Sequence, residues 1–169
     1  RIHAVVGAHH GTLLHRMAAD PVKPHVWRDL GKMGAKATHP CLVCDRRGVL
    51  HLVYRSSAEN PWLLCYQRHG TDGAWSKPMP LLRAAKTWYV TWTNSLAIAP
   101  DNTLHLVFAA TRHDARARTT YYGASHVNSK DGGQTWQQYG GTSLSLPAPV
   151  RELAPIEDPS EAASRTVAD

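Results

Sequence analysis

Several histidines and arginines stand at the ends of apolar runs, where neighbouring segments of a folded chain could bring them together. His9 and His10 precede one run, His39 precedes another, and Arg55 ends a third. Imidazole exchanges protons near neutral pH, and guanidinium forms a bidentate pair with a carboxylate. These groups could carry out β-elimination on a uronate polymer, in which a base removes the C5 proton once the carboxylate is neutralised. By this chemistry, His9, His10 or His39 could act as base or acid, and Arg55 or Arg112 could pair with the carboxylate. We predict His9, His10, His39 and Arg55 as catalytic residues.

Other polar and aromatic side chains near the same ends of the runs suit substrate binding. Indole rings can stack on sugar faces, and amide, guanidinium and imidazole groups can bind hydroxyl or carboxylate oxygens. The predicted substrate-binding residues are Trp88, Trp92, Asn94, Arg112 and His113. An alternative is purely structural, with the tryptophans packed between units of the fold, Arg55 bridging them, and His9 and His10 exposed in a loop.

A repeat explains how the chain would position these residues. The runs 1–6, 49–54 and 103–108 each place a histidine (His3, His51, His105) in a strand-like stretch. A second strand and then a tryptophan follow each run, and residues 39–44 and 94–98 form a matching earlier strand. Helical periodicity is absent, and a unit of about 50 residues with four strands is typical of a propeller blade. We expect an all-β chain, a β-propeller fragment of about three four-stranded blades, with the three repeated histidines in the core or between blades.

The repeat also predicts the organisation of the chain. Residues 1–36 would be a partial blade that lacks its first strand, residues 37–86 a second blade, and residues 87–146 a third. Residues 147–169 are rich in proline and polar residues and would connect to a missing blade. Three blades do not close a ring, because propellers have four to eight. We expect the chain to be part of a longer protein.

The segment from Ser129 to Trp136 matches the Asp-box pattern S-x-D-x-G-x-T-W in full. An aspartate in such a turn accepts backbone hydrogen bonds, and a glycine permits a left-handed conformation. The tryptophan would pack back into the blade. We expect a structural role, not a ligand-binding one, for the five residues that define the pattern: Ser129, Asp131, Gly133, Thr135 and Trp136.

Together with the pattern of residues 39–75, the Asp-box resembles BNR-repeat proteins of the sialidase-like β-propeller superfamily. The chain is similar in particular to the BNR-repeat family that includes ulvan-type polysaccharide lyases. The resemblance implies a six- or seven-bladed propeller that acts on or binds glycans, outside the cell or in the periplasm. In the lyases a tyrosine precedes the proline that opens the first strand, and here His39 stands before Pro40. The resemblance narrows the choice of catalytic residues, since Arg55 matches the lyase arginine and the lyase histidine would correspond to His9 or His10.

Three functions remain open at this point. The first is a carbohydrate-active propeller that acts on an acidic polysaccharide by lyase-type β-elimination, with a histidine base and Arg55 on the carboxylate. The second is a sialidase-like glycoside hydrolase whose acids lie outside this chain, since Glu59 and Asp114 are the main acids near the candidate residues. The third is a glycan-binding BNR propeller without catalysis.

Composition narrows the possible partners. The chain has 169 residues with 19 Lys and Arg against 13 Asp and Glu, a formal net charge of +6. These charges are dispersed, which argues against a nucleic-acid reader and suits an acidic glycan. No apolar run is long enough to span a membrane. We expect a monomer at full length.

No metal site is predicted. Cys41 and Cys44 have the spacing of half a zinc site, but on a strand their side chains would point to opposite faces. No second pair follows, and buried core cysteines are the better interpretation. We predict no cofactor, and a structural calcium or zinc ion stays open.

Overall fold

The computed structural model describes residues 1–7, 9–84, 89–114 and 117–156, with the backbone alone for 89–93, 111–114 and 117–123. The elements are β1 (Ile2–Gly7), β2 (Gly11–Ala18), β3 (Trp27–Cys44), β4 (Leu50–Ser56), β5 (Leu63–His69), β6 (Met79–Arg83), β7 (Tyr89–Ile98), β8 (Leu104–Asp114), β9 (Ala117–Ser129), β10 (Gln137–Gln138), β11 (Ala148–Pro149) and the 3₁₀ helix η1 (Val150–Glu152). The predicted all-β class is confirmed.

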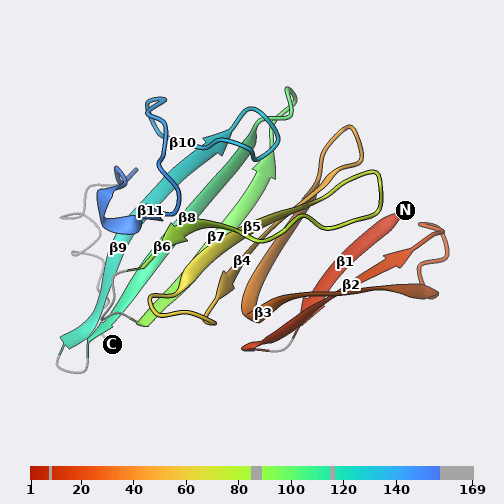
Figure 1. Cartoon of the computed structure of the whole chain (residues 1–169), viewed down its shortest axis with the longest axis horizontal. Coiled ribbons are helices and arrows are strands. Elements are labelled where there is room, and N and C mark those ends of the chain that lie inside the picture. Colours follow the sequence, from red (N-terminus) through yellow and green to blue (C-terminus); the bar gives the residue numbers. More distant parts are fainter. Residues whose placement is uncertain (8, 85–88, 115–116, 157–169) are drawn as a thin grey trace.

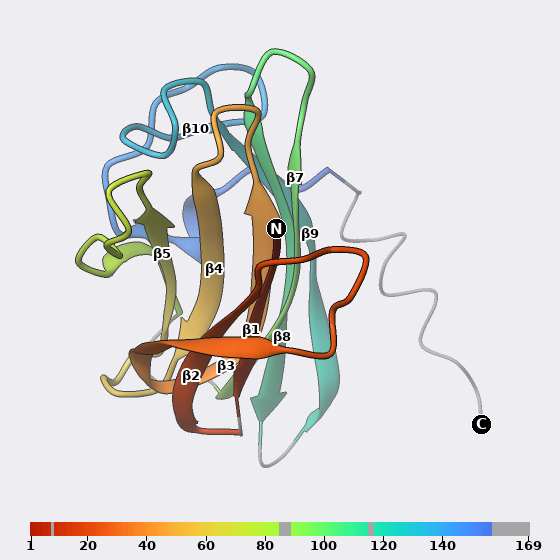
Figure 2. The ribbon, with the colours of Figure 1, turned by 90° about the vertical axis from the view of Figure 1, so that its right-hand side faces the viewer.

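The strands form two sheets of antiparallel hairpins. One has the order β1-β2-β3-β4-β5-β6-β11 and the other β10-β9-β8-β7, with β11 parallel to β6. Figure 1 shows three groups of strands side by side, and Figure 2 shows the same groups from the side. We call them the first blade (β1, β2 and the start of β3), the second (the end of β3 with β4–β6) and the third (β7–β10). This open arrangement is that of a propeller fragment, as predicted.

Strand β3 belongs to two blades at once. Its first half pairs with β2, and its second half pairs with β4. The pairing with β4 breaks between Thr38 and Cys41, where a β-bulge re-aims the chain. The expected division between residues 36 and 37 falls inside this continuous strand. The first two blades therefore share one hydrogen-bonded ladder.

The core lies between neighbouring blades. All seven residues of β4 are buried, because this strand is covered on both faces. Leu52 and Tyr54 pack in the cluster shared with the first blade, and Val53 packs in the cluster shared with the third. Alternate residues of a strand point to opposite faces, so one apolar strand supplies both clusters.

The three repeated histidines occupy equivalent places. Each bonds through Nδ1 to a side chain two positions along the neighbouring strand: His3 to His15 Nε2 (2.9 Å), His51 to Tyr66 Oη (2.7 Å) and His105 to His126 Nε2 (3.0 Å). The register is the same in each case, because the bonded residue on the neighbouring strand lies directly opposite a valine. The three pairs are Val5 with His15, Val53 with Tyr66 and Val107 with His126. The sequence repeat is therefore also a repeat of side-chain contacts.

The turn from Ser129 to Trp136 joins β9 to β10. Asp131 Oδ1 accepts hydrogen bonds from Gln134 N and Thr135 N (both 2.9 Å), and Ser129 Oγ accepts one from Gly133 N (2.8 Å). Gly133 has φ 88°, and a Cβ there would collide with the Tyr66 ring of the second blade. Trp136 is buried with 1% of its surface exposed. The turn thus caps its own blade and packs against the previous one.

The cysteines only partly follow the prediction. All three are free thiols; Cys65 is buried and Cys41 half-buried, whereas Cys44 is exposed. Cys44 ends β3 next to the polar turn at Asp45, so its side chain reaches solvent. Within the described ranges, no helix has the length and apolar character needed to cross a membrane.

Candidate functional site

Four predicted residues gather at one end of the first two blades. His9 and His10 lie in the turn between β1 and β2, His39 lies at the bulge of β3, and Arg55 lies near the end of β4. The ring centroids of His9 and His10 are 4.1 Å apart, and those of His9 and His39 are 6.4 Å apart. All three histidines are exposed. We call His9, His10, His39 and Arg55 the histidine cluster.

Backbone conformation marks the same place. Four non-glycine residues of the described chain have positive φ, and three of them are His10 (56°), Lys36 (46°) and His39 (53°). Such conformations cost free energy for residues with a Cβ, and they concentrate at functional sites. The bulge and these three residues turn β3 and the β1–β2 loop toward each other. The cluster is therefore held in a costly but specific geometry.

Ser57 holds His10 in place. Ser57 Oγ lies 2.7 Å from His10 Nδ1 and 3.1 Å from the carbonyl oxygen of Lys36, which also accepts the backbone N–H of Ser57. When the hydroxyl donates to Lys36, His10 Nδ1 donates to Ser57 Oγ and the lone pair of the neutral ring is on Nε2. An exposed imidazole in this tautomer is equipped to act as a base.

Arg55 departs from the repeat. The residues at the equivalent position of the other two blades are Gly7 and Ala109. Its side chain is fully buried, with Cζ 4.6 Å from the centroid of the Trp62 ring, a cation–π distance. Trp62 also meets the His10 ring at 5.7 Å. A residue that breaks a structural repeat and places a charge under an exposed cluster points to function.

The pKa values of two histidines are lowered. Desolvation is the first cause for His10, followed by the charges of His9, Arg55 and Lys36. Desolvation is also first for the pKa of His39, followed by the charges of Arg55 and His9. A lowered pKa keeps an imidazole neutral, and so able to accept a proton, at neutral pH. The site is thus a positive region with neutral bases.

Of the predicted substrate-binding residues, Asn94 has a described contact with the cluster. Asn94 is half-buried, and its Nδ2 donates to the carbonyl oxygen of His39 (3.4 Å), which joins β7 to the cluster. Its Oδ1 is buried without a hydrogen-bond partner in the described part of the chain. Trp92 opposes Ala110 and Arg112 opposes Val90 in the β7–β8 ladder, and His113 opposes Tyr89. For these three only the backbone is described, and Trp88 lies outside the described residues.

Sequence reasoning missed three neighbours of the cluster. Trp62, Ser57 and Lys36 were not among the predicted site residues, although each contacts it or shapes it. Trp62 directly precedes β5, at the same blade end as Arg55, and this position was a signal that could have been used. Nothing in the sequence indicates the Lys36 carbonyl, because its role depends on a positive φ.

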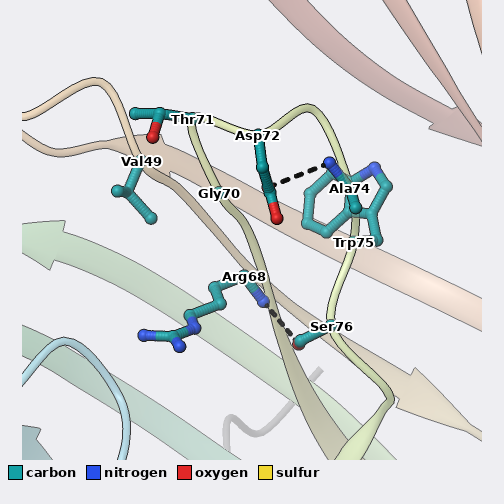
Figure 3. A pocket seen from close by; sticks show the side chains of 8 residues that line it. All are labelled: Val49, Arg68, Gly70, Thr71, Asp72, Ala74, Trp75 and Ser76. Carbon is teal, nitrogen blue, oxygen red and sulfur yellow. Dashed lines mark hydrogen bonds between the residues drawn. The ribbon is translucent and has the colours of Figure 1, made fainter.

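A separate hollow lies at the opposite end of the second blade. It has a volume of about 500 Å³ and is lined by Val49, Arg68, Gly70, Thr71, Asp72, Ala74, Trp75 and Ser76. Figure 3 shows its turn tied by Asp72 Oδ1, which accepts from Ala74 N (3.2 Å), and by Ser76 Oγ, which accepts from Arg68 N (3.1 Å). No predicted catalytic or substrate-binding residue lines it. Among the described residues, no group of three His, Cys, Asp or Glu could hold a metal ion.

Comparison with known families decides the classification. The model of the BNR repeat-containing family matches residues 1–166. The chain belongs to this family. No curated protein matches it significantly.

Solved structures agree with the fold of this BNR repeat protein. An ulvan lyase of polysaccharide lyase family 25 is similar with a TM-score of 0.68 and 17% identity, over 85% of this chain and 35% of the lyase. The same lyase has also been solved bound to GlcA(1-4)Rha3S. An α-L-arabinofuranosidase of Fusarium graminearum is similar with a TM-score of 0.53 and 18% identity, over 85% of this chain and 46% of that enzyme. The chain thus spans less than half the length of either enzyme, both of which are carbohydrate-active propellers.

Proposed function

We propose that this BNR repeat protein cleaves an acidic polysaccharide by β-elimination at a uronate residue. The observation that carries the proposal is the setting of His10, an exposed imidazole with a lowered pKa that is held through Nδ1 by Ser57 and lies near the charge of Arg55. The likeness to an ulvan lyase supports the same reaction class. Since the substrate is a large polymer, the protein would act outside the cell or in the periplasm, and as a monomer at full length.

The reaction would use the residues of the cluster in a defined order. The charges of Arg55 and Lys36 attract the substrate carboxylate and stabilise the negative charge that develops on it. His10 Nε2 removes the C5 proton, and the electron pair of the broken C–H bond forms the C4–C5 double bond. The C4–O bond breaks, and its electron pair leaves with the glycosidic oxygen. The imidazolium of His10 returns its proton to that oxygen, which restores the neutral base.

His39 and Asn94 would orient the sugar in this scheme. His39 is exposed beside His9, and the Asn94 amide bonds to the His39 backbone, so both side chains border the same face. Arg55 is fully buried, with Cζ 4.6 Å from the centroid of the Trp62 ring. In this scheme its charge acts on the carboxylate at a distance, and a bidentate pair would require the guanidinium to become accessible. Trp88, Trp92, Arg112 and His113 are proposed to line the adjoining substrate surface.

The test is incubation of the full-length protein with uronate polymers. We expect a rise in the ultraviolet absorbance of the unsaturated uronate product. His10→Ala and His39→Ala should abolish the rise, whereas His25→Ala, at an exposed histidine outside the cluster, should leave it unchanged. Reducing ends released without the absorbance would instead show a glycoside hydrolase. Retained glycan binding with neither signal would show a non-catalytic propeller.

A further inference from the structure

In the first two blades, the residue that bonds to the repeated histidine also forms a hydrogen bond with the next blade. In the first blade, His15 Nδ1 accepts a hydrogen bond from the indole Nε1–H of Trp75 in the second blade (3.2 Å). In the second blade, Tyr66 Oη donates to the carbonyl oxygen of Gly132 in the third (2.9 Å). Tyr66 also packs edge-on against Trp136, with ring centroids 5.4 Å apart. The first and second blades thus each present one side chain to the tryptophan-bearing turn of the next blade.

The first of these contacts is directional. Because His15 Nδ1 accepts from Trp75, the proton of the neutral His15 ring must be on Nε2. His15 Nε2 therefore donates to His3 Nδ1. The three groups form a chain of donors running from the indole through His15 to His3. Such a chain needs a neutral imidazole and an N–H donor from the adjoining blade.

The third blade has the hydrogen bond within the blade, but in the described ranges it lacks the hydrogen bond to a next blade. His126 repeats the His15 position and bonds through Nε2 to His105, but nothing in the described ranges bonds to its Nδ1. Asn128 Oδ1, two residues further on, is buried and lacks a partner among the same residues. Val107 is 39% exposed, whereas the equivalent Val53 is 0% exposed beneath the third blade. On this face the described residues therefore leave two acceptors without a donor and the Val107 side chain partly exposed.

We propose that this face of β8 and β9 packs against a further four-stranded repeat of the same kind, and that a tryptophan in the turn of that repeat donates its indole N–H to His126 Nδ1. The occupant follows from continuity with the two interfaces already present, which use the same strand positions. A histidine at this position selects an indole donor, as His15 does, and the tyrosine of the second blade instead selects a carbonyl oxygen. Asn128 Oδ1 would accept a second hydrogen bond from the same turn.

The test compares His126→Tyr in the 169-residue chain and in the protein at its full encoded length. Tyrosine keeps the hydrogen bond within the blade, as Tyr66 does with His51, but removes the Nδ1 acceptor. We expect the melting temperature to fall by about 1–2 °C at full length, for the loss of one hydrogen bond, and to stay the same in the shorter chain. His15→Tyr is the matched control and should lower the melting temperature of both, because Trp75 is present in both.

A measurement on the unmodified protein keeps the test valid if a variant does not fold. At full length, nitrogen NMR should find His126 as the Nε2–H tautomer, with a coupling across the hydrogen bond to an indole Nε1. Equal effects of His126→Tyr in both lengths, or a His126 Nδ1 without an indole partner at full length, would overturn the proposal. So would a dimer of the 169-residue chain that Trp27→Phe abolishes, since a second copy would then cover the face through its exposed Trp27.

Discussion

The turn at Ser129–Trp136 and the histidine cluster lie at opposite blade ends and use their polar residues in opposite ways. In the turn, Asp131 accepts hydrogen bonds from three neighbouring residues, and Trp136 is buried. In the cluster, His10 and His39 are exposed and adopt positive φ without the freedom of glycine. In the turn, the polar side chains bond to the backbone of the turn itself, whereas in the cluster the histidine rings stay accessible to a ligand. Polar residues that satisfy each other locally indicate structure, and polar residues held at a conformational cost indicate function.

The largest expected effect concerns the cluster. His10→Ala should lower the rate of uronate elimination by about 10²–10⁴-fold, the usual contribution of a general base. Since His10 is exposed, the free energy of unfolding should change by no more than about 0.5 kcal/mol. Rates on a uronate polymer and urea denaturation measure the two quantities. A loss of stability matching the loss of activity would assign His10 a structural role, like that of the turn.

The turn should show the reverse behaviour. Gly133→Ala adds a Cβ against the Tyr66 ring at positive φ and should destabilise the chain by about 2–4 kcal/mol. Gly140→Ala is the matched control, with φ 89° but no atom within 4 Å of the added Cβ, and should cost about 1 kcal/mol. Urea denaturation of both variants measures the difference. Equal costs would mean that backbone conformation, not the contact between blades, decides the residue at position 133.

The interface between the first two blades should be sensitive to acid. Burial, then the charges of His69 and His3, lowers the pKa of His15 to about 4 from 6.5. The unfolded chain therefore binds this proton first, and the free energy of unfolding should fall as the pH drops from 6.5 toward 4. The slope is at most about 1.4 kcal/mol per pH unit for this residue. Urea denaturation between pH 7 and 5 should show a smaller slope for His15→Gln and an unchanged one for His25→Gln.

The smallest effect concerns the support of the base. Ser57→Ala removes the hydroxyl that holds His10 Nδ1 and should lower kcat about tenfold with little change in KM, because this contact orients the base. Ser57→Thr should restore the rate, and nitrogen NMR of His10 should show the mixed tautomers of the alanine variant. An unchanged tautomer in Ser57→Ala would remove Ser57 from the positioning of His10.

Much of the fold was predictable because a repeat amplifies weak local signals. The spacing of His3, His51 and His105 predicts hairpins in equivalent places, and the pairing agrees. Strand direction also placed His9, His10, His39 and Arg55 at one end of the blades, where the structure has them. Their catalytic roles stay predictions.

What the sequence could not reveal depends on backbone irregularity and burial. The bulge at His39 and the positive φ of Lys36 break the alternation on which strand reasoning rests. Arg55 is fully buried and contacts Trp62 across the β4–β5 hairpin. The predicted pairing of Arg55 with a substrate carboxylate did not include this burial, because it depends on how the folded hairpin packs.

Strand β3 determines where this repeat protein can be divided. A boundary between blades is normally the natural point for exchanging, duplicating or permuting modules. Here the first two blades share one strand, and a one-residue insertion in it would turn the side chains beyond the insertion to the opposite face. The polar turn 45–49, which lies within the second blade, is therefore a safer point of division than the junction of the two blades. A module divided at residues 45–49 would leave β3 with the first blade, although the end of β3 packs as part of the second blade. The module that can be exchanged is thus shifted by one strand relative to the blade.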